Sequence, residues 1–315
     1  MSVENIIEVK NLFKKYKGAE KNSVDGISFN VKQGEFFAFL GPNGAGKTTT
    51  ISILTTTLAP TSGEIKIAGF DLEKDQNSVR KNIGVIFQNP SLDVNLTAEE
   101  NLRMHAILYG LFPFRPLFRL MPEEYKKRVK ELGDVLDLKE EIFRPLKTFS
   151  GGMKRKLEII RTLLHKPKIL FLDEPSSGLD PLSRKNLWNY LKEVREKEGT
   201  TVFLTTHYLD EAEDADNVCV INEGKIVVQG TPSSIKEELI DEVLEINSRD
   251  RKSLEQELDS KGIKYRNSDV IQIDLKNMDV HSLIKGIETK LDVIKVLKPT
   301  LEEAYIQIVE RKEEK

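Results

Sequence analysis

The stretch that decides the fold is Gly41-Pro42-Asn43-Gly44-Ala45-Gly46-Lys47-Thr48. It matches the glycine-rich phosphate loop, G-x-x-x-x-G-K-[ST], at every fixed position. The preceding residues 35–40 form an apolar run of strand length, and residues 48–54 are expected to begin a helix. A strand, a glycine-rich loop and a helix in this order predict a binding site for the phosphates of a nucleoside triphosphate.

Each residue type in the loop has an expected role. Glycines let successive backbone N–H groups turn toward the phosphates, and the helix N-terminus adds partial positive charge. Lys47 is expected to contact the β and γ phosphates, and the Thr48 hydroxyl to bind Mg²⁺. The residues of this segment that we expect to bind the nucleotide are Gly41, Pro42, Asn43, Gly44, Ala45, Gly46, Lys47, Thr48 and Thr49.

A second motif, Ile169-Leu170-Phe171-Leu172-Asp173-Glu174-Pro175, joins an apolar run to two acids. Such a run is typical of a strand buried on both faces of a parallel sheet, and ligands bind at the carboxyl ends of such strands. Asp173 is expected to hold Mg²⁺, and Glu174 to orient and polarise the attacking water. Because neighbouring residues of a strand point to opposite sides, we expect the two carboxylates to serve two different roles.

A third motif, Phe149-Ser150-Gly151-Gly152-Met153-Lys154, precedes the acidic strand. It resembles the signature LSGGQ, with Phe149 in place of Leu and Met153 in place of Gln. With the other motifs, it makes the chain resemble the ATP-binding subunit of an ABC transporter, in particular the multidrug and sodium export branch. The resemblance implies that Ser150, Gly151 and Gly152, at the start of a helix over 153–165, contact the γ phosphate of an ATP held by the other subunit.

The resemblance covers residues 6 to 230 and implies roles for four more residues. Tyr16 would stack on adenine, and Gln88 would contact Mg²⁺ or the attacking water. A half-exposed strand tyrosine and a plain loop amide are the alternatives for these two. Asp180, in the run Ser177-Gly178-Leu179-Asp180, would lie in the loop that spans the dimer interface. His207 would be the switch histidine that contacts the γ phosphate.

The fold implied by the resemblance is α/β: a P-loop ABC ATPase core with an antiparallel β subdomain and a helical subdomain, plus a small C-terminal α+β domain. We expect the ATPase domain over 1–235, with its helical subdomain at about 95–160, and the accessory domain over 236–315. Thr97 and Glu100 are spaced as a capping box that opens a helix. The tail alternates strand-like and helix-like segments, which suggests a ferredoxin-like arrangement.

A phenylalanine-rich stretch over 111–122 interrupts the helical subdomain, and its three prolines argue against a continuous helix. It is longer than the turn that the family usually has there. Its aromatic and basic residues suggest contact with a membrane subunit or with loops at the level of the lipid headgroups. The alternative is an internal plug in which these rings are buried within the subdomain. The sequence alone does not choose between the two.

Composition limits the other function classes. The net charge of −3 comes from nearly balanced acids and bases, which argues against a nucleic-acid binder. We expect the basic clusters 126–128 and 154–156 to lie on solvated helix faces. Cys219 is the only cysteine, so an intramolecular disulfide is excluded. We see no signal peptide and no apolar run that could span a bilayer. We therefore expect a peripheral subunit at the cytoplasmic face of the cell membrane, bound to a separate permease.

The family mechanism implies that two subunits, as a homodimer or a heterodimer, enclose two ATP molecules with Mg²⁺. Closure of the dimer, followed by hydrolysis and reopening, would drive the permease. A soluble ABC clamp not coupled to transport is the main alternative, and a regulatory ATP-binding protein is disfavoured by Glu174 and His207. The run from Thr205 to Glu213 and the tail resemble exporters, while import stays an alternative. The sequence does not identify the transported substrate.

Overall fold

The computed structural model of the protein describes residues 4–87, 91–176, 180–239, 243–275, 278–297, 300–303 and 305. The chain divides into two compact units, residues 1–229 and 230–315. The division falls slightly before residue 235, where the sequence suggested the end of the first domain. In the described part of the chain, no helix is both long enough and apolar enough to cross a membrane.

The first unit is organised around a six-stranded sheet in the order β10-β9-β3-β8-β7-β6. Neighbours β9, β3, β8, β7 and β6 pair in parallel. Every residue of β3, β7 and β8 is buried, as expected where other layers cover both faces. The strands are β3 (Phe36–Leu40), β6 (Ile83–Ile86), β7 (Ile169–Asp173), β8 (Thr201–Thr206), β9 (Asn217–Asn222) and β10 (Lys225–Gly230).

An antiparallel sheet in the order β2-β1-β4-β5 packs on one side of the central sheet. The two sheets share a cluster of phenylalanines, in which the Phe37 ring lies 5.6 Å from Phe29 and 5.3 Å from Phe203. These apolar rings exclude water between the layers. The strands of this sheet are β1 (Asn5–Lys14), β2 (Val24–Lys32), β4 (Ser62–Ile67) and β5 (Phe70–Asp71).

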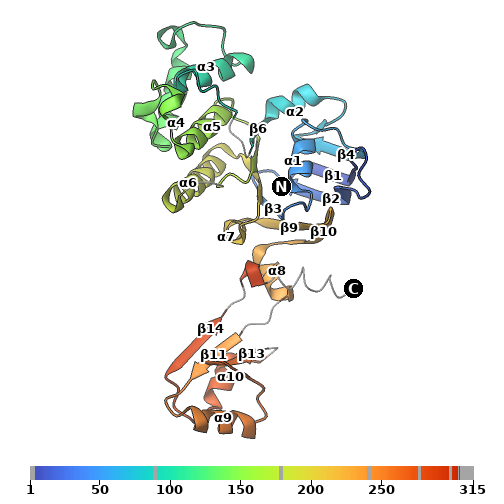
Figure 1. Cartoon of the computed structure of the whole chain (residues 1–315), viewed down its shortest axis with the longest axis vertical. Coiled ribbons are helices and arrows are strands. Elements are labelled where there is room, and N and C mark those ends of the chain that lie inside the picture. The colour runs from blue at the N-terminus through green and yellow to red at the C-terminus, as the bar shows by residue number, and fades with distance from the viewer. Residues whose placement is uncertain are drawn as a thin grey trace. The chain divides into compact units, whose positions relative to one another are not determined.

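Helices α3, α4 and α5 gather on the other side of the central sheet and form the predicted helical subdomain (Figure 1). Their core includes the fully buried Tyr125 and Leu157. The helices of the first unit are α1 (Lys47–Leu54), α2 (Gln76–Asn82), α3 (Ala98–Leu108), α4 (Glu123–Val135), α5 (Gly151–Leu163), α6 (Pro181–Glu198) and α7 (Leu209–Ala212). Short 3-10 turns lie at η1 (Phe118–Leu120), η2 (Lys139–Glu141) and η3 (Leu146–Thr148).

The predicted helix starts are confirmed to within two residues, and α1 begins at Lys47 rather than Thr48. Thr97 and Glu100 make a full capping box at the start of α3. Helix α5 begins at Gly151 rather than Met153, because the Ser150 hydroxyl accepts the Met153 N–H at 3.2 Å and so caps a first turn made of the two glycines.

The second unit contains the element order β-α-β-β-α-β in a sheet ordered β12-β13-β11-β14, with all pairs antiparallel. This is the ferredoxin-like arrangement that the tail pattern suggested. The described part of a final helix begins after Thr300, whose hydroxyl oxygen accepts the Glu303 N–H at 3.2 Å. Pro299 lies outside the described residues. The elements are α8 (Pro232–Leu239), β11 (Val243–Asn247), α9 (Arg251–Ser260), β12 (Arg266–Asn267), β13 (Ile271–Asp274), α10 (Val280–Lys285) and β14 (Val293–Leu297).

Two glycines allow the loop between β3 and α1 to pass close to neighbouring backbone. A Cβ at Gly41 would lie 2.3 Å from the Ile221 carbonyl oxygen, and one at Gly46 would lie 2.4 Å from that of Ser23. Gly46 also has φ +107, a left-handed conformation that other residues rarely adopt. The path of the loop is therefore fixed by the strands beside it.

Substitution of Gly46 tests this packing constraint, with Gly44 as a matched control. Gly44 has φ +82 but open space at its Cβ position, so Gly44→Ala should cost only the left-handed strain, about 1 kcal/mol. Gly46→Ala adds a clash with backbone and should lower the free energy of unfolding by about 2–4 kcal/mol. Urea unfolding followed by Trp188 fluorescence measures both. Equal losses in the two variants would contradict the packing argument.

Candidate functional site

The predicted site residues follow strands that end side by side. In the parallel register, Leu40 at the end of β3 pairs with Thr206 at the end of β8, and Asp173 at the end of β7 pairs with Thr205. The glycine-rich loop, Glu174 and His207 therefore leave one edge of the sheet together. Carboxyl ends of parallel strands are the usual ligand-binding edge of such sheets.

Lys47 is held inside the loop that precedes it. Its Nζ donates to the carbonyl oxygens of Gly41 at 2.8 Å and Pro42 at 3.2 Å, and it lies 3.8 Å from Glu174 Oε1. Burial lowers the pKa of Lys47, while the carboxylates of Glu174 and Asp173 raise it. The ammonium group is therefore positioned by the backbone and faces the two acids of the second motif.

Asp173 is the last residue of β7 and is almost fully buried. Its Oδ1 accepts a hydrogen bond from the Thr205 hydroxyl of β8. Burial raises the pKa of Asp173, and the Thr205 hydrogen bond opposes that shift. The Thr205 contact fixes the orientation of the carboxylate, as a metal-binding acid requires.

Glu174 differs from the prediction in how it leaves the strand. It is not a strand residue: its φ of 47° is left-handed, while its N–H donates to the Thr205 carbonyl at 3.0 Å. We expected different roles for the two carboxylates because neighbouring residues of a strand point to opposite sides. That reason was wrong, because the strand ends at Asp173 and the backbone turns at Glu174. The turn brings Glu174 Oε1 to 3.1 Å from His207 Nδ1. Such a strained conformation is typical of functional positions.

Tyr16 and the first turn of α1 come together from distant parts of the sequence. Thr48 is exposed, and the Thr49 hydroxyl lies 3.3 Å from the Tyr16 hydroxyl. Tyr16 is 45% exposed, so a face of its ring is available for stacking, and Lys14 Nζ lies 5.6 Å from the ring centroid. An aromatic ring beside the phosphate loop is where an adenine base would need one.

The third motif lies apart from these residues. Ser150 and Gly151 are exposed, and among the described residues no hydrogen bond or ion pair joins the 150–152 turn to the phosphate loop. Asp180 precedes α6, where its Oδ1 accepts the Leu182 N–H at 3.0 Å. Gln88 and the run 177–179 lie outside the described residues. One chain thus brings the phosphate loop, Tyr16 and the residues at the ends of β7 and β8 together, but it does not bond the Ser150 turn to them in the described structure.

Arg155 was assigned to a solvated face, and that expectation was wrong. Its guanidinium is buried; it pairs with Glu158 at 3.2 Å and donates to the carbonyls of Phe87, Asp173 and Pro175. Arg128 is likewise mostly covered. The signal was available, because Arg155 and the buried Ile159 stand four residues apart on one face of α5.

Glu211 of α7 was not singled out by its sequence, yet it joins two of the motif segments. It is buried, and its carboxylate accepts the hydroxyls of Ser176, which follows the acidic strand, and of Thr206, which precedes His207. Burial raises the pKa of Glu211, and the two hydroxyl hydrogen bonds lower it. Glu211 therefore holds the backbone around His207 to the segment after Glu174.

A groove of about 580 Å³ lies beside β6, α3 and α5. The rings of His105, Tyr109 and His165 stack along it, with centroids 4.2 Å and 4.7 Å from the central Tyr109. Burial lowers the pKa of His105 to about 3 and also lowers that of His165, so the positive charge of the groove comes from Arg80 and Arg161. The groove is basic and aromatic, and Phe87 at its edge accepts a hydrogen bond from Arg155.

Removal of the Glu211 carboxylate should affect turnover more than nucleotide affinity. We expect Glu211→Ala to lower the ATP turnover number about tenfold or more, because the hydroxyls that position the His207 segment lose their acceptor. The dissociation constant for ATP should change little, since the hydrogen bonds of Glu211 in the described part of the chain go to Ser176 and Thr206, which are not among the residues expected to bind nucleotide. Asp210→Ala, at an exposed neighbouring acid, is the control. A parallel loss of affinity and turnover would mean that Glu211 supports the whole site.

Comparisons with known proteins agree with this geometry. The ABC transporter family profile matches residues 24–177. The daunorubicin/doxorubicin resistance ATP-binding protein DrrA of Streptomyces peucetius is 41% identical over 78% of this chain and 72% of its own length. The uncharacterized ABC transporter ATP-binding protein YcbN of Bacillus subtilis (strain 168) is 37% identical over 85% of this chain and 84% of its own.

Solved structures give the same result. An ATP-binding subunit of an ABC transporter matches with a TM-score of 0.65 and 33% identity, covering 74% of this chain and 92% of that one. An ATP-binding cassette solved as a dimer in a post-hydrolysis state, with ADP and Pi bound, matches with a TM-score of 0.64 and 27% identity, covering 71% and 98%. This chain therefore belongs to the ABC transporter family, as an ATP-binding subunit with ATPase activity.

Proposed function

We propose that this chain energises export through a separate membrane permease, and that two subunits do so by closing around two ATP molecules. The observation that carries the proposal is the position of Glu174, whose carboxylate lies between Lys47 and His207 at the edge of the sheet. A carboxylate beside a phosphate-binding lysine and an imidazole is arranged to orient water for attack on a terminal phosphate.

The residues of the loop would bind the triphosphate. Backbone N–H groups of residues 43–46 and the N-terminus of α1 would supply the donors and the partial positive charge, and Lys47 would add a full positive charge. Tyr16 would stack on the adenine. Glu174 would act as the general base, and His207 would contact the γ phosphate and hold Glu174 in place.

We propose that Thr48, Asp173 and Gln88 hold Mg²⁺. Hydroxyl, carboxylate and amide oxygens are the hard ligands that this ion prefers. The fit is supported by Asp173, whose carboxylate is oriented by Thr205 at the end of β7. The ion would neutralise charge on the β and γ phosphate oxygens during transfer.

The second half of each site would come from the partner subunit. The exposed Ser150 turn is a helix N-terminus and thus fits an anion, yet it has no contact with the phosphate loop of its own chain among the described residues. Two copies arranged head to tail would each offer this turn to the ATP of the other. A related cassette solved as a dimer with ADP and Pi supports such pairing.

The permease would dock in the groove beside β6. The Arg155 guanidinium donates to the carbonyl of Phe87, which lines this groove, and to that of Asp173 at the end of β7. A permease segment bound in the groove would therefore be connected to the hydrolytic residues through the Arg155 side chain. Relatives named for daunorubicin, linearmycin and bacitracin resistance or transport favour export as the direction. The subunit would then lie at the cytoplasmic face of the membrane.

Glu174→Gln tests the proposed mechanism. The amide keeps the size of the side chain but cannot accept a proton, so steady-state ATPase activity should fall by about a hundredfold or more. The variant should also form a stable dimer when ATP and Mg²⁺ are added, because every binding group is intact. Size-exclusion chromatography with light scattering follows this, with Lys47→Ala as the control that should neither hydrolyse nor dimerise. Full activity in Glu174→Gln would show that another group serves as the base.

A further inference from the structure

The phenylalanine-rich stretch presents an apolar and basic surface that ATP hydrolysis does not use. Phe114 is 63% exposed, Leu117 46% and Leu120 49%, and Phe143 from a neighbouring turn is 58% exposed. Phe143 belongs with them because its ring lies 5.1 Å from that of Phe118 in the same stretch. We call these four residues, with Arg115 and Arg119, the Phe114 surface.

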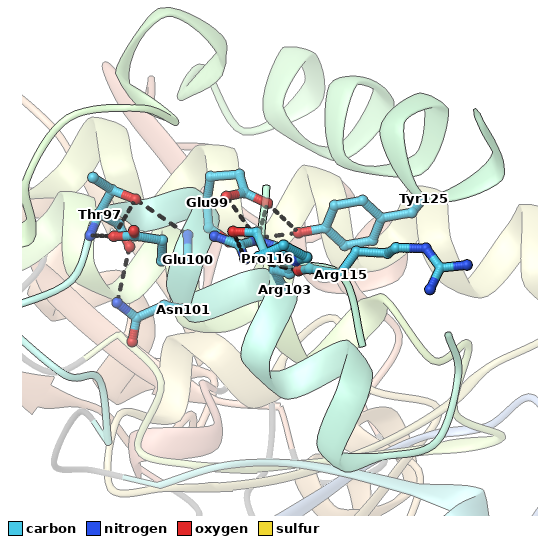
Figure 2. A network of polar contacts seen from close by, with 8 residues as sticks. All are labelled: Thr97, Glu99, Glu100, Asn101, Arg103, Arg115, Pro116 and Tyr125. Carbon is cyan, nitrogen blue, oxygen red and sulfur yellow. Dashed lines mark hydrogen bonds and ion pairs between the residues drawn. The ribbon is translucent and has the colours of Figure 1, made fainter. Parts of the chain in front are cut away.

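A buried polar network fixes the backbone of the stretch that carries this surface (Figure 2). Arg103 of α3 donates from Nη1 to the carbonyls of Arg115 at 3.0 Å and Pro116 at 2.7 Å. Its Nε pairs with Glu99 at 3.0 Å, and Glu99 accepts the Tyr125 hydroxyl at 3.2 Å. An arginine buried to this extent is uncommon and here fixes the backbone of an exposed loop.

The rings of the stretch divide between two directions. Phe112 and Phe118 pack edge-on against the buried Tyr125, at 5.7 Å and 6.1 Å between centroids. Phe114 is left outside, and in Figure 2 the neighbouring Arg115 side chain extends away from the network. Phe112 and Phe118 therefore pack inside the subdomain, as the plug alternative expected, while the exposed Phe114 leaves the contact alternative open for the rest of the stretch.

The two charged residues of the surface, Arg115 and Arg119, are both basic. No acidic residue occurs from Gly110 to Pro122, and in the described part of the chain neither Arg115 nor Arg119 forms an ion pair. The acids that follow open α4, where Glu123 pairs with Lys126 at 2.7 Å. Two unpaired guanidinium groups thus flank exposed Phe and Leu side chains.

We propose that the Phe114 surface binds the headgroup region of an anionic lipid bilayer. Aromatic and aliphatic side chains beside arginine are the combination that partitions into this region, with the rings below the phosphates and the guanidinium groups among them. Because the buried network already orders the loop, little conformational entropy is lost on binding. The lack of any acid within the stretch favours a lipid phosphate over a mixed-charge protein surface.

The position of the surface next to the groove also supports this role. This argument rests on the proposed docking of a permease in the groove. Tyr109, which lines the groove, lies two residues before the stretch, so the groove and the stretch are joined through the end of α3. A subunit docked by that groove beneath a permease would turn this end of α3 toward the bilayer. The surface would then steady the subunit against the membrane beside the permease.

Vesicle binding of the full chain tests the proposal without any permease. We expect flotation with vesicles of phosphatidylcholine mixed with phosphatidylglycerol, but little with phosphatidylcholine alone, and a loss of binding as salt rises. Phe114→Ser with Leu117→Ser and Leu120→Ser should abolish flotation. Arg115→Gln with Arg119→Gln should lower the partition coefficient on anionic vesicles about tenfold or more.

Matched controls separate this surface from general effects of charge and apolar exposure. Phe70→Ser removes an exposed ring from β5, away from the 111–122 stretch in sequence, and Lys252→Gln with Lys264→Gln removes two charges from the second unit; neither should change binding. A direct reporter is Phe114→Trp in a Trp188→Phe background, whose emission should shift to the blue on anionic vesicles. ATP binding of each variant checks the fold.

Three outcomes would overturn the proposal: flotation that ignores lipid charge, variants that float like the parent chain, or an indole in the Phe114→Trp reporter that stays in water. Each leaves the ATPase mechanism intact, because Glu174→Gln reads that mechanism separately. If the Phe114 variants lost only their co-purification with the permease, the surface would be a protein contact and the lipid proposal would be wrong.

Discussion

The parallel pairing of β3, β8 and β7 is the constraint on which the rest of the site depends. Because of this pairing, the carboxyl ends of the three strands lie at one edge of the sheet. The glycine loop, Asp173 and the segment before His207 are therefore neighbours although they are far apart in sequence. Phenylalanine packing stabilises this strand register. Phe203 of β8 pairs with Phe37 of β3 and with Phe171 of β7, and its ring contacts both of theirs. A slip by one residue would exchange the two faces of a strand and separate the acids from Lys47.

Short segments with a strong local pattern were predictable from the sequence. The glycine loop, the acidic strand and the Thr97 capping box all occur where their patterns place them, because each depends on residues close in sequence. The conformation of Glu174 was not predictable, since it depends on a contact with the Thr205 carbonyl of another strand. The same holds for the directions of the Phe112 and Phe118 rings, which pack against Tyr125 of α4.

Buried charges link the parts that sequence reading treated separately. Arg155 joins α5 to the backbone at Phe87 and at Asp173, and Glu211 joins the segments after Glu174 and before His207. Each is satisfied by several partners, as a buried charge must be. Of the two, the Arg155 connection reaches the groove, so one buried side chain joins the groove residue Phe87 to the strand that ends in Asp173. The Arg103 network has the same character, but it orders a surface rather than the site.

The central claim is that a complete hydrolytic site needs the phosphate loop of one chain and the Ser150 turn of another. The most direct test mixes two inactive variants, Lys47→Ala and Gly151→Asp. Gly151 has open space at its Cβ position, so the aspartate should leave the helix intact and repel the γ phosphate. A mixed dimer joins the intact phosphate loop of the Gly151→Asp chain to the intact Ser150 turn of the Lys47→Ala chain, and neither variant alone can form such a site. ATPase activity should therefore return on mixing, to at most about half of the parent activity, because each mixed dimer has one intact site of two. A mixture that stays inactive while mixed dimers form would contradict a site shared between two chains.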